Sequence, residues 1–408
     1  LADIRAPTLI MWGKANPLVM HLEAKDPYLH GHSQRVARLV EEIGARLAER
    51  GHEVTIYSRL HYTKVGGIYR GMRILRLPSL NTKHLDTITH WALSTIDTIL
   101  RRHDIVHYHA LGPSVFSGLP HLRRSRTAVT VHGLDWQRGK WGKSAQWFLR
   151  QCEKPAIRFP DRTIVVSDYT RRELEALTGV DPARVRVVAN AVHPRFLAPG
   201  DPAADGAALD RLGVSGRYVL FVSTIEPRKN VPVLLDAFRS LLDEGRELSL
   251  VLAGADGWHS EAVYRRVRDL ALGGRARFLG HVSATDLPAL LRRAAVLAHP
   301  ALDEGFGLAP LEAMAVGTPT VVSDAGALPE VVGDAGLRVP PDDTYGWARA
   351  LARMLDDPEL ARACASAGRR RAAAFSIERQ ARGTLEVYRE VLAERADPRA
   401  ANDRRRRP

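Results

Sequence analysis

Short apolar runs alternate with helical periodicities along most of the 408-residue chain. Apolar runs that are separated by helical segments are typical of parallel strands joined in βαβ units. In the first half the pattern predicts strands at residues 8–12, 54–57, 72–77, 105–108, 128–131, 163–166 and 185–188. In the second half it predicts strands at 218–223, 248–253, 277–279, 296–298 and 320–322. The chain is therefore expected to be an α/β protein.

The helices of the first half follow the same periodic argument. One helix begins after residue 32 and ends at Gly51, and a second spans residues 85–101. The apolar positions of the first helix all fall on one face: Val36, Leu39, Val40, Ile43 and Leu47. A final helix is expected at about residues 376–395, beyond the last strand signals.

The chain turns polar and rich in small residues between residues 196 and 215, which indicates a linker. We therefore predict a first doubly wound domain at 1–198 and a second at 199–375. The helix at 376–396 is expected to cross back to the first domain, and 397–408 form a basic tail. Doubly wound sheets bind ligands at the carboxyl ends of their strands, so we expect the ligand in a cleft between the domains.

The charge of the chain is unevenly distributed. It has 59 Lys and Arg against 46 Asp and Glu, a net charge of +13. This whole excess lies in residues 1–200, which indicates that the first half faces nucleic acid, anionic lipid or a phosphorylated substrate. Two cysteines are too few for a disulfide scaffold, and no apolar run reaches the ~20 residues that a membrane span needs. A reducing, cytoplasmic location is expected.

The segment EGFGLAPLE at 304–312 carries two carboxylates, Glu304 and Glu312, around a glycine-rich turn. Pro310 fits the first turn of a helix that Gly317 ends. Glycines let backbone amides approach a ligand closely, and a helix N-terminus favours a phosphate. Glu304 could then accept hydrogen bonds from a sugar ring and Glu312 from a ribose; a solvated helix is the alternative.

Two further segments lie at predicted strand ends. EPRKN at 226–230 places Arg228 and Lys229 where they suit a diphosphate, although an ordinary surface turn is the alternative. VHGLDWQ at 131–137 places His132 at the end of a first-domain strand, where it is either a ligand contact or a structural histidine. His107 and His109 resemble a metal pair, but no third ligand stands nearby in the sequence, so no metal site is predicted.

These segments resemble the retaining glycosyltransferases of family 4, which have the GT-B fold. The resemblance rests on EPRKN, on FLGHV at 278–282 and on HPALDEGFGLAPLEAMAVGTPTVVSDAGALPEVVGDAG, and it covers roughly residues 36–395. The stretch from GHEVTIYSR to TVHGLDWQRGKWG is similar to a bacterial branch that builds envelope polysaccharides. The resemblance implies two Rossmann-like domains with an interdomain cleft. It departs at residues 26–37, where Gly31 stands alone in place of the family's glycine pair.

The family resemblance also implies a role for each matching residue. Glu304 and His132 would contact the transferred sugar, Glu312 the ribose, and Arg228 with Lys229 the diphosphate. The whole implied donor site consists of Thr224, Arg228, Lys229, His281, Val282, Gly305, Phe306, Gly307, Leu308 and Glu312. Such enzymes need no metal and no cofactor beyond the donor, and retention is attributed to a front-face route without a side-chain nucleophile.

The leading hypothesis is a hexosyltransferase that extends an envelope glycan or a lipid-linked acceptor. The alternatives are a non-catalytic nucleotide-sugar-binding protein and a GT-B sugar-nucleotide epimerase. The donor can be GDP- or UDP-linked, and nucleic acid is not an expected partner. Basic residues of the first domain interleave with tryptophans, which suits docking on an anionic membrane surface. These residues are Arg123, Arg124, Lys140 and Lys143, with Trp136, Trp141 and Trp147.

Overall fold

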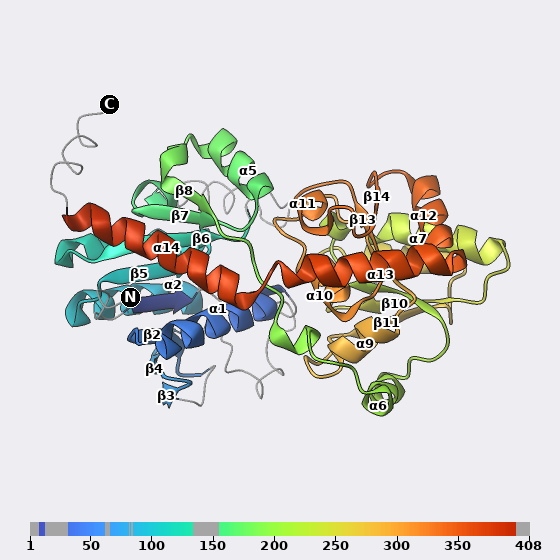
Figure 1. The fold of residues 1–408 in the computed structure, drawn as a ribbon, viewed down its shortest axis with the longest axis horizontal. Coiled ribbons are helices and arrows are strands. Elements are labelled where there is room, and N and C mark those ends of the chain that lie inside the picture. The colour runs from blue at the N-terminus through green and yellow to red at the C-terminus, as the bar shows by residue number, and fades with distance from the viewer. Residues whose placement is uncertain are drawn as a thin grey trace. The chain divides into compact units, whose positions relative to one another are not determined.

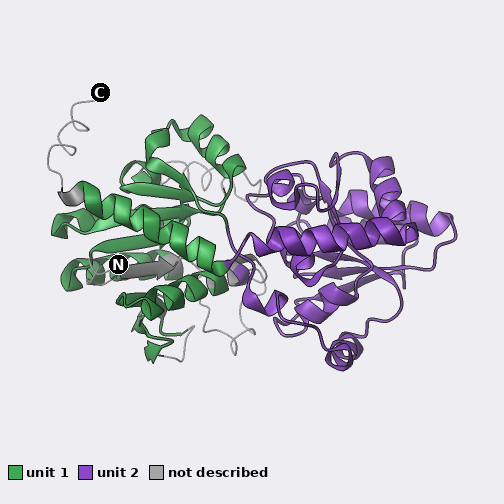
Figure 2. Ribbon diagram, in the orientation of Figure 1, with its two compact units in different colours: residues 1–23, 36–189, 377–408 green, residues 24–35, 190–376 purple. Residues whose placement is uncertain are grey.

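The computed structural model describes residues 8–12, 32–61, 66–80, 82, 85–133 and 155–396. Its contacts divide the chain into two compact units (Figure 2). Unit 1 comprises residues 1–23, 36–189 and 377–408, and unit 2 comprises residues 24–35 and 190–376. The longer segment of unit 2 begins at residue 190, nine residues before the start at 199 that the polar segment predicts.

Unit 1 is built on an eight-stranded sheet with the order β3-β4-β2-β1-β5-β6-β7-β8 (Figure 1). Every neighbouring pair is parallel except β3 with β4, which is antiparallel. The strands are β1 (Thr8–Trp12), β2 (Val54–Arg59), β3 (Gly67–Tyr69), β4 (Met72–Leu77), β5 (Ile105–His109), β6 (Arg126–Val131), β7 (Arg162–Val165) and β8 (Val185–Val187). The seven strands predicted for this half are confirmed within two residues. β3 escapes prediction because it has three residues, all outside the core.

The helices of unit 1 pack against this sheet. In α1 (His32–Glu49) the predicted stripe is buried at Leu39, Val40, Ile43 and Leu47, with Leu47 fully buried, and Gly51 follows with a φ of +85°. The remaining elements before the boundary are α2 (Leu85–Arg101), α3 (Leu111–Ser114), η2 (Leu119–Arg123), α5 (Asp168–Thr178) and η4 (Pro182–Arg184). Ser167 caps α5 by accepting a hydrogen bond from Thr170 N, and Gly179 ends it.

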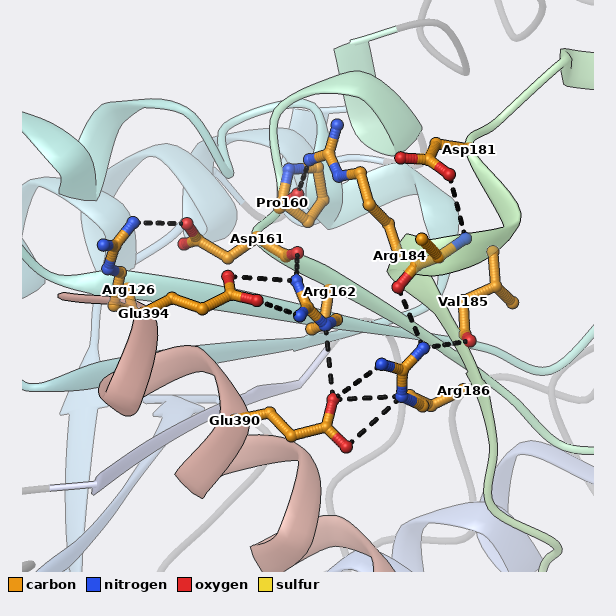
Figure 3. Close-up of polar contacts among 11 residues, drawn as sticks. Arg126, Pro160, Asp161, Arg162, Asp181, Arg184, Val185, Arg186, Glu390 and Glu394 are labelled. Carbon is orange, nitrogen blue, oxygen red and sulfur yellow. Dashed lines mark hydrogen bonds and ion pairs between the residues drawn. The ribbon is translucent and has the colours of Figure 1, made fainter. Parts of the chain in front are cut away.

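The last helix, α14 (Ile377–Ala396), returns to unit 1 and packs on β6. Charged side chains fix its position (Figure 3). Arg162, which is only 3% exposed, pairs with Glu394 and lies 3.5 Å from Glu390. Arg186 Nη2 lies 2.9 Å from the same Glu390 carboxylate. The helix is thus tied to β7 and β8 by arginines from both strands.

Unit 2 is built on a wholly parallel sheet with the order β11-β10-β9-β12-β13-β14. The strands are β9 (Tyr218–Val222), β10 (Ser249–Ala253), β11 (Ala276–Gly280), β12 (Val296–His299), β13 (Thr320–Ser323) and β14 (Leu337–Val339). The central strands β9 and β12 are buried along their whole length. The strands predicted in this half are again confirmed, and β14 is the addition. Both sheets are Rossmann-like, as the sequence predicts.

Helices of unit 2 lie before, between and after the strands of this sheet. They are α6 (Pro202–Leu212), α7 (Val231–Asp243), α8 (Glu261–Asp269), α9 (Leu287–Arg293), α10 (Leu308–Val316), α11 (Leu328–Val332), α12 (Thr344–Asp356) and α13 (Pro358–Ala373), with the short η5 (Pro194–Phe196) and η6 (Pro227–Lys229). No helix in the described part of the chain is long and apolar enough to cross a membrane.

The expectation of a plain linker at residues 196–215 is wrong, because α6 lies inside that segment. Asp201 caps the helix by accepting a hydrogen bond from Ala203 N, Pro202 occupies the first turn, and Gly213 ends it with a φ of +63°. The Asp205 carboxylate anchors the helix through two hydrogen bonds from Arg292 on α9, of 2.8 and 2.5 Å. Small residues with correct caps therefore form a helix here.

Candidate functional site

The predicted donor residues of unit 2 all follow the carboxyl ends of strands. Thr224, Arg228 and Lys229 come after β9, His281 and Val282 come after β11, and the segment 304–312 comes after β12. Because all strands of this sheet are parallel, these loops lie on one edge of the sheet. The order of the strands puts β9 beside β12, so their loops are neighbours.

The basic turn after β9 is held by the loop after β12. Pro227, Arg228 and Lys229 form the single turn η6, which Asn230 ends in the left-handed region with a φ of +54°. Leu302 N donates a hydrogen bond of 2.8 Å to Arg228 O, and Arg228 Nη1 donates to Asp303 O. Arg228 Nη2 also donates to Glu226 Oε1 at 3.0 Å. Backbone and side chain together fix the orientation of the guanidinium.

Glu304 is the centre of a buried polar cluster. Its Oε1 atom accepts hydrogen bonds from Lys229 Nζ and, at 2.9 Å, from His299 Nε2. Its Oε2 atom lies 3.3 Å from Arg228 Nη1. Glu304, Lys229 and His299 are 7%, 4% and 1% exposed. We call Arg228, Lys229, His299 and Glu304 the Glu304 cluster.

The charges of the Glu304 cluster follow from its burial. Burial alone would raise the pKa of Glu304, but Lys229 and Arg228, with the hydrogen bond from His299, hold it well below its usual value. Burial lowers the pKa of Lys229 to about 8, although Glu304 opposes the change. Burial also lowers the pKa of His299, so its neutral ring donates Nε2–H to the carboxylate. At neutral pH the Glu304 cluster therefore holds one carboxylate and two cations in a buried position.

Two glycines shape the backbone around Glu304. Gly326 follows β13 with a φ of +61°, and a Cβ atom there would lie 2.6 Å from Glu304 N and 2.7 Å from Glu304 O. The next residue, Ala327, donates its N–H to Glu304 O at 2.8 Å. Gly307 has a φ of +105°, and a Cβ atom there would lie 2.6 Å from Leu328 Cδ2. Gly326 therefore requires glycine for space and for backbone conformation, and Gly307 requires it for backbone conformation.

The other members of the predicted segment divide into core residues and candidate ligand contacts. Phe306 and Leu308 are buried, and the Phe306 ring packs edge-on against Phe375 with ring centroids 5.8 Å apart. Their side chains therefore fill the core of unit 2. Gly305 lies beside Glu304 in the same loop, and Glu312 is 4% exposed within α10, beyond its first turn.

Close backbone contacts join the loops after β9, β10 and β11. A Cβ atom on Gly254 would lie 1.8 Å from Ser223 O, and Gly254 N donates to Gly280 O at 2.7 Å. Thr224 lies against Gly257, whose Cβ would be 2.9 Å from Thr224 Cγ2. His281 and Val282 follow directly, and Val282 is 8% exposed. These contacts bring Thr224 and the turn at residues 281–282 to the same edge of the unit 2 sheet.

His132 lies in unit 1, directly after β6. Its Nε2 atom is 3.4 Å from His109 Nδ1, and the His109 ring stacks on His107 with centroids 4.2 Å apart. His107 in turn contacts Tyr388 OH on α14 at 2.7 Å. Burial lowers the pKa of His107 to about 3, so this ring is neutral. Within the described residues, no group of three or more His, Cys, Asp or Glu side chains could hold a metal ion.

Several residues of the site were not singled out from the sequence. His299 contacts Glu304 directly, and its position at the end of β12 was the available signal. Gly254 and Gly326 also follow strands. The need for glycine at these positions becomes clear only from the backbone atoms that lie beside them in the fold. Other predictions lie outside the described residues: the loop around Gly31, the tail 397–408, and Lys140 and Lys143 with Trp136, Trp141 and Trp147.

Two family models match most of the chain. The model for Glycosyltransferase Family 4 matches residues 36–196, and the model for Glycosyl transferases group 1 matches residues 212–371. The first match lies in unit 1 apart from its last residues, and the second lies in unit 2.

Curated relatives and a solved structure agree with these matches. The O-antigen chain mannosyltransferase B of Escherichia coli is 34% identical over 227 residues, which cover 55% of this chain and 59% of that protein. The D-inositol 3-phosphate glycosyltransferase of Kineococcus radiotolerans is 36% identical over 272 residues, 62% of each chain. The matches thus span about three fifths of the length of these relatives. HepE of Anabaena, in complex with UDP and glucose, has a TM-score of 0.74 at 17% identity over 94% of this chain and 100% of that chain. The chain belongs to the group 1 and family 4 glycosyltransferases and has their GT-B fold.

Proposed function

We propose that this chain is a retaining hexosyltransferase that uses a nucleotide diphosphate sugar and needs no metal ion. The observation that carries the proposal is the Glu304 cluster, which combines two cations and a carboxylate at the carboxyl edge of the unit 2 sheet. Two relatives are named a mannosyltransferase and an inositol-phosphate glycosyltransferase, and a protein of the same fold holds UDP and glucose. These names favour a hexose donor and a nucleotide diphosphate.

In this proposal Arg228 and Lys229 stabilise the diphosphate as it leaves. Negative charge develops on the leaving phosphate, and cations in a buried position stabilise it more strongly than water does. The two side chains thus supply the electrostatic work that a metal ion performs elsewhere. Glu312 is proposed to bind the ribose, and the turn with His281 and Val282 to meet the base.

In this proposal, donor binding requires one rearrangement of the Glu304 cluster of the free protein. The carboxylate oxygens of Glu304 already accept from Lys229, Arg228 and His299. An incoming diphosphate therefore has to draw the two cations toward itself, which leaves the Glu304 oxygens available to the sugar hydroxyls. Glu304 and His132 would then contact the sugar, and the acceptor would use unit 1.

The acceptor is proposed to be an envelope glycan or a lipid-linked sugar, reached from the cytoplasmic face of the membrane. The mannosyltransferase relative carries O-antigen chain in its name, which favours a polysaccharide acceptor. The proposal requires no nucleic acid and no resident cofactor. The donor is the substrate.

Titration calorimetry with UDP, GDP and their hexose conjugates tests the donor site. One nucleotide family is expected to bind without added metal and in the presence of EDTA, and Arg228→Met is expected to weaken it by at least about ten-fold, as loss of a charge-assisted hydrogen bond implies. Arg265→Met, at an exposed position on α8, is the matched control. Absence of binding by every nucleotide, or equal binding by the Arg228 variant, would refute this donor site.

A further inference from the structure

Two histidines of β5 share one face of the unit 1 sheet with His132. Side chains two residues apart on a strand point to the same side, so His107 and His109 lie on one face. The neighbouring strand β6 runs parallel to β5 and pairs Thr130 with His109, and His132 follows two residues later. The proposed transfer gives a role to His132 but none to His107 or His109.

His107 is held at both of its ring nitrogen atoms. Its Nδ1 atom lies 2.7 Å from Tyr388 OH on α14, and its Nε2 atom lies 2.7 Å from Thr130 Oγ1. All three side chains are buried. Burial lowers the pKa of His107 to about 3 and raises the pKa of Tyr388, so the ring is neutral and the phenol keeps its proton. Two hydroxyl groups therefore fix the position and the plane of a neutral ring.

His109 contacts both this fixed ring and His132. Its ring stacks on the ring of His107, with centroids 4.2 Å apart and planes inclined by 29°. Its Nδ1 atom lies 3.4 Å from His132 Nε2, and the planes of these two rings are inclined by 19°. Burial, together with His107 and His132, lowers the pKa of His109 well below its usual value. His109 is therefore a neutral ring that is supported by His107 and presents Nδ1 to His132.

A hydrogen bond between two imidazole rings links the positions of their hydrogen atoms. A neutral imidazole has one N–H group and one nitrogen lone pair. The bond therefore forms only when one of the two facing nitrogen atoms carries a hydrogen and the other does not. If His132 carries its hydrogen on Nε2, then His109 Nδ1 must offer a lone pair, and the other tautomer of His132 requires a hydrogen there. The tautomer of His132 is thus coupled to the tautomer of His109.

We propose that His109 is a positioning residue that holds His132 in one tautomer and one ring orientation for contact with the transferred sugar. The inference rests on the proposed function, which gives His132 that contact. Sugar hydroxyl groups both donate and accept, so a ring of fixed tautomer selects one of these two arrangements at the hydroxyl that it meets. His107, held by Tyr388 and Thr130, keeps the plane of His109 in place. The pair on β5 therefore serves His132.

NMR of the full chain with 15N-labelled histidine tests the positioning without any substrate. Long-range 1H–15N correlations distinguish a ring nitrogen that carries hydrogen from one that has a lone pair, and the variant His132→Gln identifies the signals of His132. The wild type is expected to show one dominant tautomer of His132. His109→Phe keeps a flat ring against His107 but lacks Nδ1, so both tautomers of His132 should be populated. His109→Asn should restore one dominant tautomer, because its amide places a hydrogen-bonding group near the position of Nδ1.

The matched control is His107→Phe, the same substitution at a buried position of the same strand. It removes the two hydrogen bonds of His107 and keeps a ring against His109, so it should lower the melting temperature but leave His132 in its wild-type tautomer. In transfer assays His109→Phe should lower kcat by about two- to ten-fold, as loss of one neutral hydrogen bond implies, without changing the affinity for nucleoside diphosphate. His109→Asn should restore most of kcat.

Three results would overturn the positioning role of His109. They are an unchanged His132 tautomer in His109→Phe, an equal change in His107→Phe, and a wild-type kcat in His109→Phe. A His132 tautomer that depends on His109 in a protein that transfers no sugar would instead refute only the proposed function.

Discussion

Replacing Glu304 by glutamine removes one negative charge from the Glu304 cluster and almost no volume. Lys229, which is 4% exposed, then keeps only the neutral carboxamide of the new side chain as a partner among the contacts described above. Arg228 still has Glu226 at 3.0 Å. The substitution therefore leaves mainly Lys229 as an uncompensated buried charge.

Breaking a buried ion pair in this way costs about 3–5 kcal/mol. We expect a loss near the lower end of that range at neutral pH, because Lys229 can release its proton. The loss should depend on pH. Burial lowers the pKa of Lys229 to about 8 while Glu304 raises it, so the variant's pKa lies lower still. The stability deficit should shrink as the pH rises through about 8 from below and then level off, because Lys229 is neutral in both proteins above that range.

The free energy of unfolding is measured in urea, with hydrogen exchange of the β9 and β12 peptides as the readout. These peptides report on unit 2 alone, which is needed because a chain of two units need not unfold in one step. The double variant Lys229→Met with Glu304→Gln should be more stable than Glu304→Gln alone, because the unpaired charge is gone. The control Glu261→Gln, at an exposed position on α8, should lose less than about 1 kcal/mol. The charge assignment would be contradicted if Glu304→Gln lowered the free energy of unfolding no more than the control does. It would also be contradicted if the loss were the same at about pH 7 and at about pH 9.

Three further outcomes follow from the same contacts. Donor binding at a pH of about 8 should take up as much as about half a proton, because the diphosphate raises the pKa of Lys229; calorimetry in buffers of different ionisation enthalpy measures this. Gly326→Ala should lower unit 2 stability and donor affinity, since the new methyl group meets the Glu304 backbone at 2.6 Å. Gly216→Ala, at a φ of +73° with nothing within 4 Å, should cost only the backbone strain of about 1–2 kcal/mol, so equal thermal shifts of the two variants would refute the steric argument. Arg162→Ala should loosen α14 and speed its cleavage by protease, and an unchanged cleavage rate would contradict the role of the arginine.

The sequence predicts most of the strands because each central strand is a continuous apolar run between turn signals, as β9 and β12 illustrate. It also places Glu304 near Arg228 and Lys229, because neighbouring parallel strands bring their loops to one edge. It does not predict α6, whose alanine-rich sequence carries little periodicity, so that the caps Asp201 and Gly213 are the main signal.

Other features depend on neighbours that are distant in the sequence. His299 stands five residues before Glu304, and only the folded loop shows that its Nε2 atom meets the carboxylate. Gly326 is explained by the backbone of Glu304, which comes from another loop. On α2 the side chains of Ser94, Thr95 and Thr98 are buried, whereas those of Leu93, Ile96 and Leu100 are exposed. The sequence does not predict this arrangement, because a helix with apolar residues on one side is ordinarily assumed to bury them.

The most direct test of the central claim is transfer itself, measured with the donor that binds in calorimetry. The account predicts that the wild type, in EDTA, releases nucleoside diphosphate and attaches the hexose to a glycan or lipid-linked acceptor with the donor's anomeric configuration, as read by NMR of the product. Glu304→Gln should bind the nucleotide but transfer the sugar far more slowly. A product of inverted configuration, a strict need for metal, or full transfer by Glu304→Gln would contradict the account.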